Sequence, residues 1–172
     1  MGKHETGFTL MELLIVIAIL LIGASIAIPD IITMGKRDGV KAEVRDLKNL
    51  FFLARMEAVK LNKSVTVVFN QAGYDYMVFE DENDSCEYDA GDEQIISKGN
   101  FSYAKLDTAN SGGDGLSFVA NDNGKPALRW DTKGLPQRNG TGFGAGTAYL
   151  QGFGAKHKVI VSKTGNIRIT SY

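Results

Sequence analysis

The sequence predicts an α+β fold in which a long N-terminal helix precedes small antiparallel β-sheets. An apolar run fills Phe8–Ile28, and apolar residues then recur at alternating spacings of four and three from Val40 to Leu61, as on one face of a helix. After Asn62, short β-branched and aromatic runs alternate with turns that contain glycine or asparagine, which is typical of antiparallel strands. The 172 residues therefore suit one folded domain plus an anchor.

The first element, Phe8–Ile28, is a run of 21 nearly unbroken apolar residues, long enough to cross a bilayer as a helix. Glu12 lies inside it, and an ionised carboxylate there costs roughly 2.5–3.5 kcal/mol, which indicates a functional residue. A secretory signal peptide has a shorter apolar core, of about 7–15 residues, and a cleavage site after that core. Here the polar residues Met1–Thr6 and then Gly7 come first, so we expect a cut before the apolar segment, which stays in the mature protein.

The residues Gly7-Phe-Thr-Leu-Met-Glu-Leu-Leu14 resemble the processing signature of type IV prepilins. The resemblance implies that a prepilin peptidase removes the leader, residues 1–7, by cutting after Gly7, and that Phe8 is then N-methylated. It also implies that Glu12 pairs with the amino terminus of a neighbouring subunit during assembly. Pairing agrees with the chemistry, because a buried ammonium and a buried carboxylate each lower the cost of the other. The alternative is an ordinary signal anchor that happens to contain a glutamate.

The second element is an amphipathic continuation of the helix over residues 29–62. Pro29 follows the apolar run, and membrane helices tolerate a proline. The stripe expected to pack on a domain consists of Val40, Val44, Leu47, Phe51, Ala54, Ala58 and Leu61, widened by Ala42, Leu50 and Leu53. One helix from Phe8 to Leu61 would be about 80 Å long.

The remaining residues, 63–172, are predicted to form an antiparallel β domain. The expected strands are Ser64–Phe69, Tyr76–Phe79, Gln94–Ser97, Leu116–Val119, Ala127–Trp130, Lys158–Ser162 and Ile167–Thr170, of which the first two form a hairpin. Gly140–Gly154 contains six glycines and is expected to be the loosest segment. Within it, Gly142–Gly146 lacks the flanking strand and helix of a nucleotide-binding loop, so we interpret it as a flexible surface loop.

Charge is unevenly distributed along the β domain. Nine acids and no lysine or arginine lie between Asp75 and Glu93, whereas six bases and no acid lie between Thr132 and Tyr172. This polarity would orient subunits head to tail or give the C-terminal region an anion-binding face; the alternative is two solvated loops of opposite sign. The acidic segment 80–93 has the oxygen ligands that calcium prefers, without the spacing of an EF-hand, and a solvated loop is the alternative there too.

The sequence offers little for catalysis. Cys86 is the only cysteine, so no intrachain disulfide forms, and we expect it to be exposed and incidental, with an intermolecular disulfide as the alternative. His4 lies in the leader, which leaves His157 and Cys86 as soft ligands, too few for a zinc site. We interpret His157 as a polar residue at a strand edge. No cofactor or metal is expected.

Three later stretches resemble the GspH/FimT family of H-type minor pseudopilins: Ala54–Val67, Leu128–Pro136 and Lys158–Ile169. The resemblance implies a pilin-like fold and a non-enzymatic subunit. It implies a single-pass protein of the inner membrane of a Gram-negative-type bacterium, held in lipid by Phe8–Ile28, with a cytoplasmic N-terminus and a periplasmic C-terminal domain. The implied partners are other pseudopilins or pilins in a filament and its tip complex, the prepilin peptidase and the inner-membrane assembly platform.

Two functions in this family are open, and a third lies outside it. The first is a minor pseudopilin of the type II secretion pseudopilus, which supports protein export. The second is a minor pilin of a type IV pilus, which acts in pilus priming or DNA uptake. DNA would be contacted by the basic C-terminal residues Lys156, Lys158, Lys163 and Arg168, because phosphate binding requires clustered bases, although many neutral residues separate these. The third is an unrelated anchored enzyme or binding protein.

Overall fold

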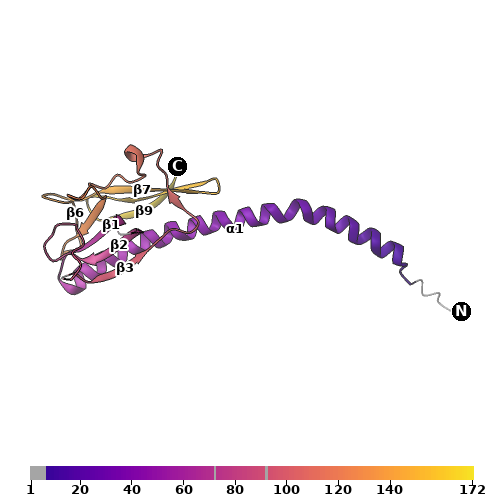
Figure 1. Ribbon diagram of the computed structural model, residues 1–172, viewed down its shortest axis with the longest axis horizontal. Coiled ribbons are helices and arrows are strands. Elements are labelled where there is room, and N and C mark those ends of the chain that lie inside the picture. Colours follow the sequence, from indigo (N-terminus) through magenta and orange to yellow (C-terminus); the bar gives the residue numbers. More distant parts are fainter. Residues whose placement is uncertain (1–6, 72, 92) are drawn as a thin grey trace. The chain divides into compact units, whose positions relative to one another are not determined.

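The computed structural model describes residues 7–71, 73–91 and 93–172 and confirms the α+β fold. One helix, α1 (Leu10–Leu61), is followed by strands only, apart from the short 3-10 turn η1 (Ser111–Gly113) (Figure 1). The strands are β1 (Val65–Gln71), β2 (Tyr74–Glu80), β3 (Ile95–Gly99), β4 (Lys105–Leu106), β5 (Ala127–Trp130), β6 (Pro136–Gln137), β7 (Gly146–Gly152), β8 (Ala155–Val161) and β9 (Ile167–Ser171). The chain divides into two compact units, Met1–Lys36 and Arg37–Tyr172.

In the described part of the first unit, α1 is helical from Leu10 onward and passes through Pro29 without a break. The Thr33 hydroxyl donates to the Pro29 carbonyl at 2.9 Å. The apolar side chains of this stretch are exposed, and none of its most hydrophobic window is buried. By length and composition this helix is able to cross a membrane.

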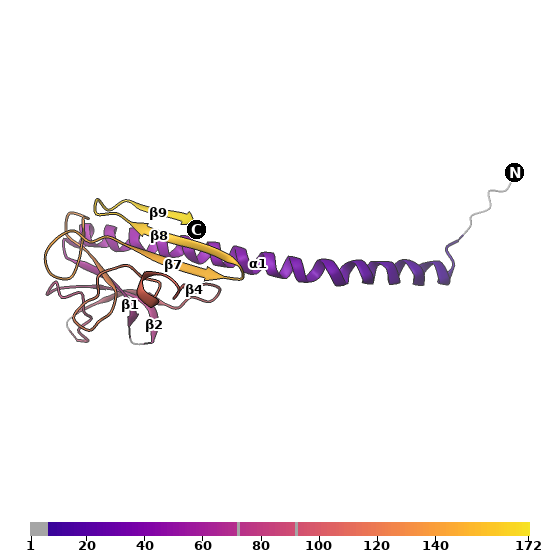
Figure 2. The ribbon, with the colours of Figure 1, turned by 90° about the horizontal axis from the view of Figure 1, so that it is seen from above.

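The second unit has two antiparallel sheets. The first sheet has the order β3-β2-β1-β5-β6 and the second the order β4-β7-β8-β9. Figure 2 shows β7, β8 and β9 side by side, as the strand pairing requires. The core lies between both sheets and the part of α1 that belongs to this unit, and its centre is a cluster of three rings, Phe51 from α1, Phe69 from β1 and Phe118, with centroids 5.5–6.2 Å apart.

The predicted helix stripe is confirmed over most of its length. Its buried members are Val40, Val44, Leu47, Leu50, Phe51, Ala54 and Ala58. Ala42, Leu53 and Leu61 are exposed instead, so the buried face is narrower than predicted and ends at Ala58. The first hairpin, with β1 and β2 paired in register from Val65 and Glu80 to Gln71 and Tyr74, is also confirmed.

The segment Gly140–Gly154 is not a loose loop, and that prediction was wrong. Half of it is β7, which pairs with β8 along its whole length. Its glycines permit close packing: a Cβ at Gly144 would lie 2.6 Å from Leu128 Cδ1. Gly144, Gly146 and Gly152 therefore reflect close packing, whereas Gly140 has open space around it.

Other strand predictions need correction. Leu116–Val119 is not a strand, since only an isolated bridge links Leu116 to Ala148. The short strands β4 and β6 were not predicted, because two residues are too few for a periodic pattern. His157 lies inside β8, between β7 and β9, rather than at a strand edge.

Cys86 and the acidic segment also differ from expectation. Cys86 is buried in a second apolar cluster on the other face of the first sheet, with Met77 and Phe79. The acidic segment covers this cluster, and Glu80, Asp81 and Glu93 are buried rather than solvated. Burial also raises the pKa of the Cys86 thiol to about 11.

Candidate functional site

The residues predicted for processing and assembly lie at the start of α1. Gly7 and Phe8 precede the helix, and both are exposed, with 84% of the Phe8 surface accessible. A protease that cuts after Gly7 would meet an accessible peptide bond outside the helix. The rest of the predicted leader, residues 1–6, lies outside the described residues.

Glu12 belongs to a capping box that the sequence analysis overlooked. Thr9 precedes the first helical residue and its carbonyl accepts from Leu13 N. The Thr9 hydroxyl accepts from Glu12 N at 3.2 Å, while Glu12 Oε2 accepts from both Thr9 N and the Thr9 hydroxyl at 2.9 Å. These reciprocal bonds satisfy donors that the first helical turn leaves unpaired. The signal was present in the sequence as Thr-x-x-Glu ahead of an apolar run.

The capping box defines what Glu12 can do chemically. Its carboxylate is exposed and its Oε2 atom is occupied by Thr9 of the same chain. Cleavage after Gly7 would create an α-ammonium on Phe8, one residue before Thr9. A positive group of this chain or of a neighbour would therefore approach a carboxylate already oriented by the helix end.

The basic residues predicted to contact anions are only partly brought together. Lys156 and Lys158 alternate along β8 on the face that bears Tyr149 of β7, and both ammonium groups lie over the ring of Tyr172 at 5.5 and 5.7 Å. Arg168 of β9 is opposite Ile160. Lys163 lies instead in the turn between β8 and β9, separate from this group.

A buried acid, Asp107, organises that sheet face. Its Oδ2 accepts from the Tyr172 hydroxyl at 2.8 Å and from the Lys156 ammonium at 3.1 Å. These donors, Tyr172 first, hold the pKa of Asp107 below its usual value, and burial and the nearby carboxylate raise the pKa of Tyr172. Lys156 is therefore partly neutralised, which weakens the surface as a phosphate site. Sequence reasoning missed Asp107, which lies outside every motif.

The buried carboxylates of the acidic segment accept hydrogen bonds mostly from backbone N–H groups of the same segment. Asp81 accepts from the Thr66 hydroxyl at 2.6 Å and from Cys86 N and Ser85 N at 2.9 and 3.0 Å. Glu93 accepts from the backbone of Glu82 and Asp89. Burial raises the pKa of both Asp81 and Glu93. Within the described residues, no group of three or more His, Cys, Asp or Glu side chains is placed to hold a metal, which gives the calcium hypothesis no support.

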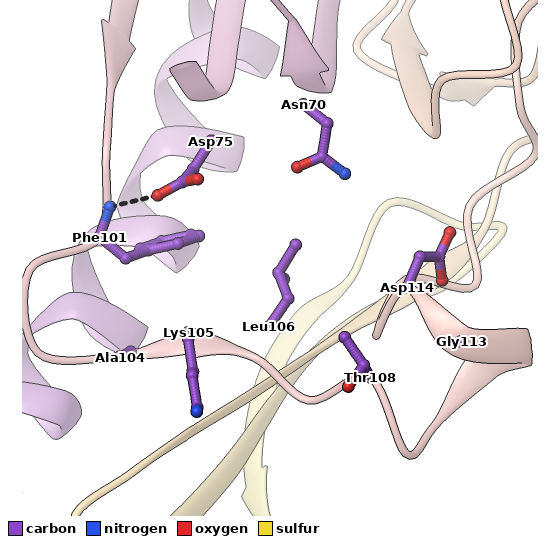
Figure 3. A pocket seen from close by; sticks show the side chains of 9 residues that line it. All are labelled: Asn70, Asp75, Phe101, Ala104, Lys105, Leu106, Thr108, Gly113 and Asp114. Atoms are coloured by element: carbon purple, nitrogen blue, oxygen red, sulfur yellow. Dashed lines mark hydrogen bonds between the residues drawn. The ribbon is translucent and has the colours of Figure 1, made fainter. Parts of the chain in front are cut away.

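A cavity of about 450 Å³ opens beside β1, β2 and β4. Asn70, Leu106 and Thr108 point into it, whereas Lys105 points away (Figure 3). Its two carboxylates serve the backbone: Asp75 accepts from Phe101 N at 2.7 Å and Asp114 from Leu116 N at 2.9 Å. Asp75 and Asp114 therefore do not form a carboxylate pair of the kind used in acid–base catalysis.

The apolar helix, its capped start and the two-sheet domain define a pilin-like, membrane-anchored subunit. The family model of the type II transport protein GspH matches residues 43–165, and that of the prokaryotic N-terminal methylation motif matches residues 2–28. Over 167 residues, 95% of this chain and 97% of the relative, the chain is 30% identical to the pilin-like protein PilA1 of Thermus thermophilus. No solved structure matches it. The chain belongs to the GspH family.

Proposed function

We propose that this chain is a minor pseudopilin of the type II secretion pseudopilus, a non-enzymatic subunit that assembles with other pseudopilins for protein export. The observation that supports this most is an exposed apolar helix with a capped, carboxylate-bearing start in one chain with a GspH-type domain. In this proposal residues 8–28 span the inner membrane, residues 29–62 continue the helix, and residues 63–172 lie in the periplasm. The leader, residues 1–7, is removed by a prepilin peptidase at the cytoplasmic face.

A second function has its own observation in favour. The relative aligned over 95% of this chain is described as pilin-like, which favours a minor pilin of a type IV pilus. The two functions separate in a strain that lacks the gene. Exoproteins retained in the periplasm would support the pseudopilus, and a normal secretome with altered surface piliation would support the pilus.

The Gly7→Ala substitution tests processing. Because the proposed peptidase requires the glycine before the cut, we expect the variant to keep its leader, and the unsubstituted chain to begin at N-methylated Phe8. Intact-mass measurement of the membrane fraction checks both. A mature chain that begins anywhere else contradicts the processing proposal. Gly23→Ala is the matched control, because Gly23 lies inside α1 and an added Cβ there would meet nothing within 4 Å.

The Glu12→Val substitution tests assembly. In the proposal, the carboxylate exchanges its bonds to Thr9 for the amino terminus of a neighbouring subunit, a pairing that is stronger inside lipid than in water. The variant should insert in the membrane normally and be lost from cross-linked or sheared filaments. Ser25→Val, which removes another polar side chain of the segment, should assemble normally. Unchanged incorporation of Glu12→Val would exclude the pairing.

Nucleic-acid binding within the second function would use Lys156, Lys158 and Arg168 on the outer face of β8 and β9, with Lys163 in the adjoining turn. Phosphate contacts release counterions, so the affinity must fall steeply with salt. Electrophoretic mobility of DNA with the Arg37–Tyr172 unit, measured across salt and with these four charges reversed, decides the matter. A mobility shift that stays the same at high salt, or after reversal of the four charges, would exclude DNA binding by this surface.

A further inference from the structure

We propose that a patch of aromatic and basic side chains on the second unit docks on the surface of an anionic lipid bilayer. The patch consists of Arg37, Tyr103, Lys105, Phe153 and Lys156, and is called the docking patch below. The inference rests on the proposed function, because it requires that residues 8–28 are in the membrane. It adds a second membrane contact, made by the folded domain itself before the subunit enters a filament.

The first observation is that two aromatic rings of the docking patch are exposed. Tyr103 is 50% exposed and Phe153 is 44% exposed, although the same unit buries Phe51, Phe69 and Phe79 completely. Aromatic side chains gather at membrane–water interfaces, where a ring lies at the level of the lipid headgroups. Two exposed rings are therefore suited to a lipid surface.

The second observation is the strained backbone at the tip of the β7–β8 hairpin. Phe153 has φ 49°, and Gly154 follows with φ 79°. A two-residue turn with positive φ at both positions favours Asn-Gly or Gly-Gly, and a bulky side chain at the first position is strained. Backbone strain of this kind clusters at functional positions, which points to a role for the phenyl ring outside the turn.

The third observation is that contacts hold the rings and bases in one place. Arg37 Nε donates to the Phe153 carbonyl at 2.9 Å, which ties the hairpin tip to α1. The Tyr103 ring lies on Gly39, where an added Cβ would be 2.7 Å from its Cγ. Glu43 fixes the loop beneath the ring, because its carboxylate accepts from the backbone N–H groups of residues 102–104 at 2.6–3.1 Å.

The docking patch is also hollowed, and Arg37 and Lys105 give it positive charge, whereas the charge of Lys156 is balanced in part by Asp107. Hollows of about 390 and 180 Å³ adjoin along Gln151–Phe153, with Lys105 beside both and Lys156 beside the smaller one. Lys105 has no ion-pair partner in the part of the chain that the structure describes, and it points away from the cavity of Figure 3. Of the neighbouring acids, Asp38 pairs with Lys41, Asp107 pairs with Lys156, and Glu43 accepts from the backbone N–H groups of residues 102–104. A phosphate headgroup has the charge and the size for such a hollow, and cationic side chains near an anionic membrane are attracted to it.

The fourth observation is the position of the docking patch in the chain. Arg37 is nine residues after Ile28, so chain connectivity alone keeps it within about 32 Å of the end of the proposed membrane segment. The anchor therefore holds the docking patch at a high local concentration of lipid. Weak contacts that would not bind a free protein suffice under these conditions.

The test uses the full chain in vesicles of phosphatidylcholine alone, or of equal parts phosphatidylcholine and phosphatidylglycerol. A polarity-sensitive fluorophore is attached at Gln151→Cys, which lies beside both hollows and replaces none of the five docking-patch residues. The buried native Cys86 leaves little background labelling. The matched control carries the label at Lys163→Cys, in the turn at the opposite end of β8, and Ser25→Cys reports insertion of the anchor.

We expect lipid-borne quenchers to quench the label at residue 151 in the anionic vesicles, and not the label at residue 163. Lys105→Glu should lower the ratio of docked to undocked domain about fivefold or more, Lys105→Arg should restore it, and added salt should weaken it. Phe153→Gly should also reduce quenching, while its melting temperature stays equal or rises because the turn strain is relieved. Folding and docking then change independently.

Each other outcome overturns the inference. Equal quenching at residues 151 and 163, or none at 151 while residue 25 is quenched, contradicts docking and leaves the proposed function intact. Protection of residue 151 that grows with protein density without lipid quenching assigns the docking patch to a second copy of the chain. Failure of residue 25 to be quenched contradicts the membrane anchor and the docking together.

Discussion

Asp81 and Asp107 are equally hidden, at 1% exposure each, yet their surroundings differ in kind. Asp81, below the first sheet, accepts bonds from neutral donors: one hydroxyl and two backbone N–H groups. Asp107, below the outer face of the second sheet, accepts from neutral donors of Ala109, Asn110 and Tyr172 and, in addition, from the Lys156 ammonium group. Burial dominates at Asp81 and raises its pKa, whereas the donors dominate at Asp107 and lower its pKa.

The comparison shows that burial of a carboxylate does not by itself determine its role. Asp81 holds the turn of the acidic segment around Cys86, because its carboxylate accepts from the backbone N–H groups of Ser85 and Cys86. Asp107 joins β4 to the C-terminal residue Tyr172 and takes part of the charge of Lys156 from the surface. The first therefore stabilises the fold, and the second also adjusts the surface charge.

The largest expected effect is that of Asp81→Ala. It leaves the buried Thr66 hydroxyl and the Cys86 N–H without acceptors, and each buried unsatisfied donor costs about 1–3 kcal/mol, so we expect a loss of about 3 kcal/mol in unfolding free energy. Chemical denaturation of the Arg37–Tyr172 unit measures it. Glu82→Ala, on the same segment but exposed, should cost at most about 0.5 kcal/mol. Equal losses for the two variants would show that burial of Asp81 is unimportant.

The pH dependence of stability should separate the two aspartates by sign. Because the folded-state pKa of Asp81 is raised, its protonated form favours the fold, and that stability is lost as pH rises from 3.8 through the raised pKa. The slope is at most about 1.4 kcal/mol per pH unit, and Asp81→Asn should remove it. The folded-state pKa of Asp107 is lowered, so its contribution is present above 3.8 and is lost as pH falls. Glu93, whose pKa is also raised, adds to the Asp81 component.

Denaturation curves collected from pH 3 to pH 7 provide the measurement, with slopes compared rather than absolute stabilities. Asp107→Asn should remove the loss on the acid side and leave the slope above pH 3.8 unchanged. If Asp81→Asn and Asp107→Asn change the pH dependence of the unfolding free energy in the same way, the opposite pKa shifts of the two aspartates are wrong.

The helix stripe, the first hairpin and the acidic segment show what could be predicted from the sequence. The helix stripe and the first hairpin follow from local periodicity, and the structure confirms both. The acidic segment was misjudged because its acceptors are satisfied by N–H groups only two to eleven residues away, in a turn geometry that composition does not reveal. Cys86 is buried with that segment, so the error about its exposure has the same cause.

The prediction for the glycine-rich segment Gly140–Gly154 was wrong because its packing depends on tertiary contacts. Gly144 and Gly152 are required by close contacts with Leu128 and Val40, and a sequence contains no sign of which distant side chain approaches a given glycine. At the candidate site, the proposed processing and assembly residues Gly7, Phe8 and Glu12 came from a local motif. The capping partner Thr9 was equally local and was overlooked, whereas Asp107 depends on contacts with residues 49 and 65 positions away.

The smallest expected effect concerns the two lysines above Asp107. The Lys158 ammonium group contacts the rings of Tyr149 and Tyr172, so Lys158→Ala should lower the unfolding free energy by about 0.5 kcal/mol. Lys156→Ala also removes an ion pair to a buried carboxylate and should lower the melting temperature more. Calorimetry of the Arg37–Tyr172 unit ranks the two. If Lys158→Ala is the more damaging, the sheet face is held by its ring contacts, and the charge of Asp107 does not organise it.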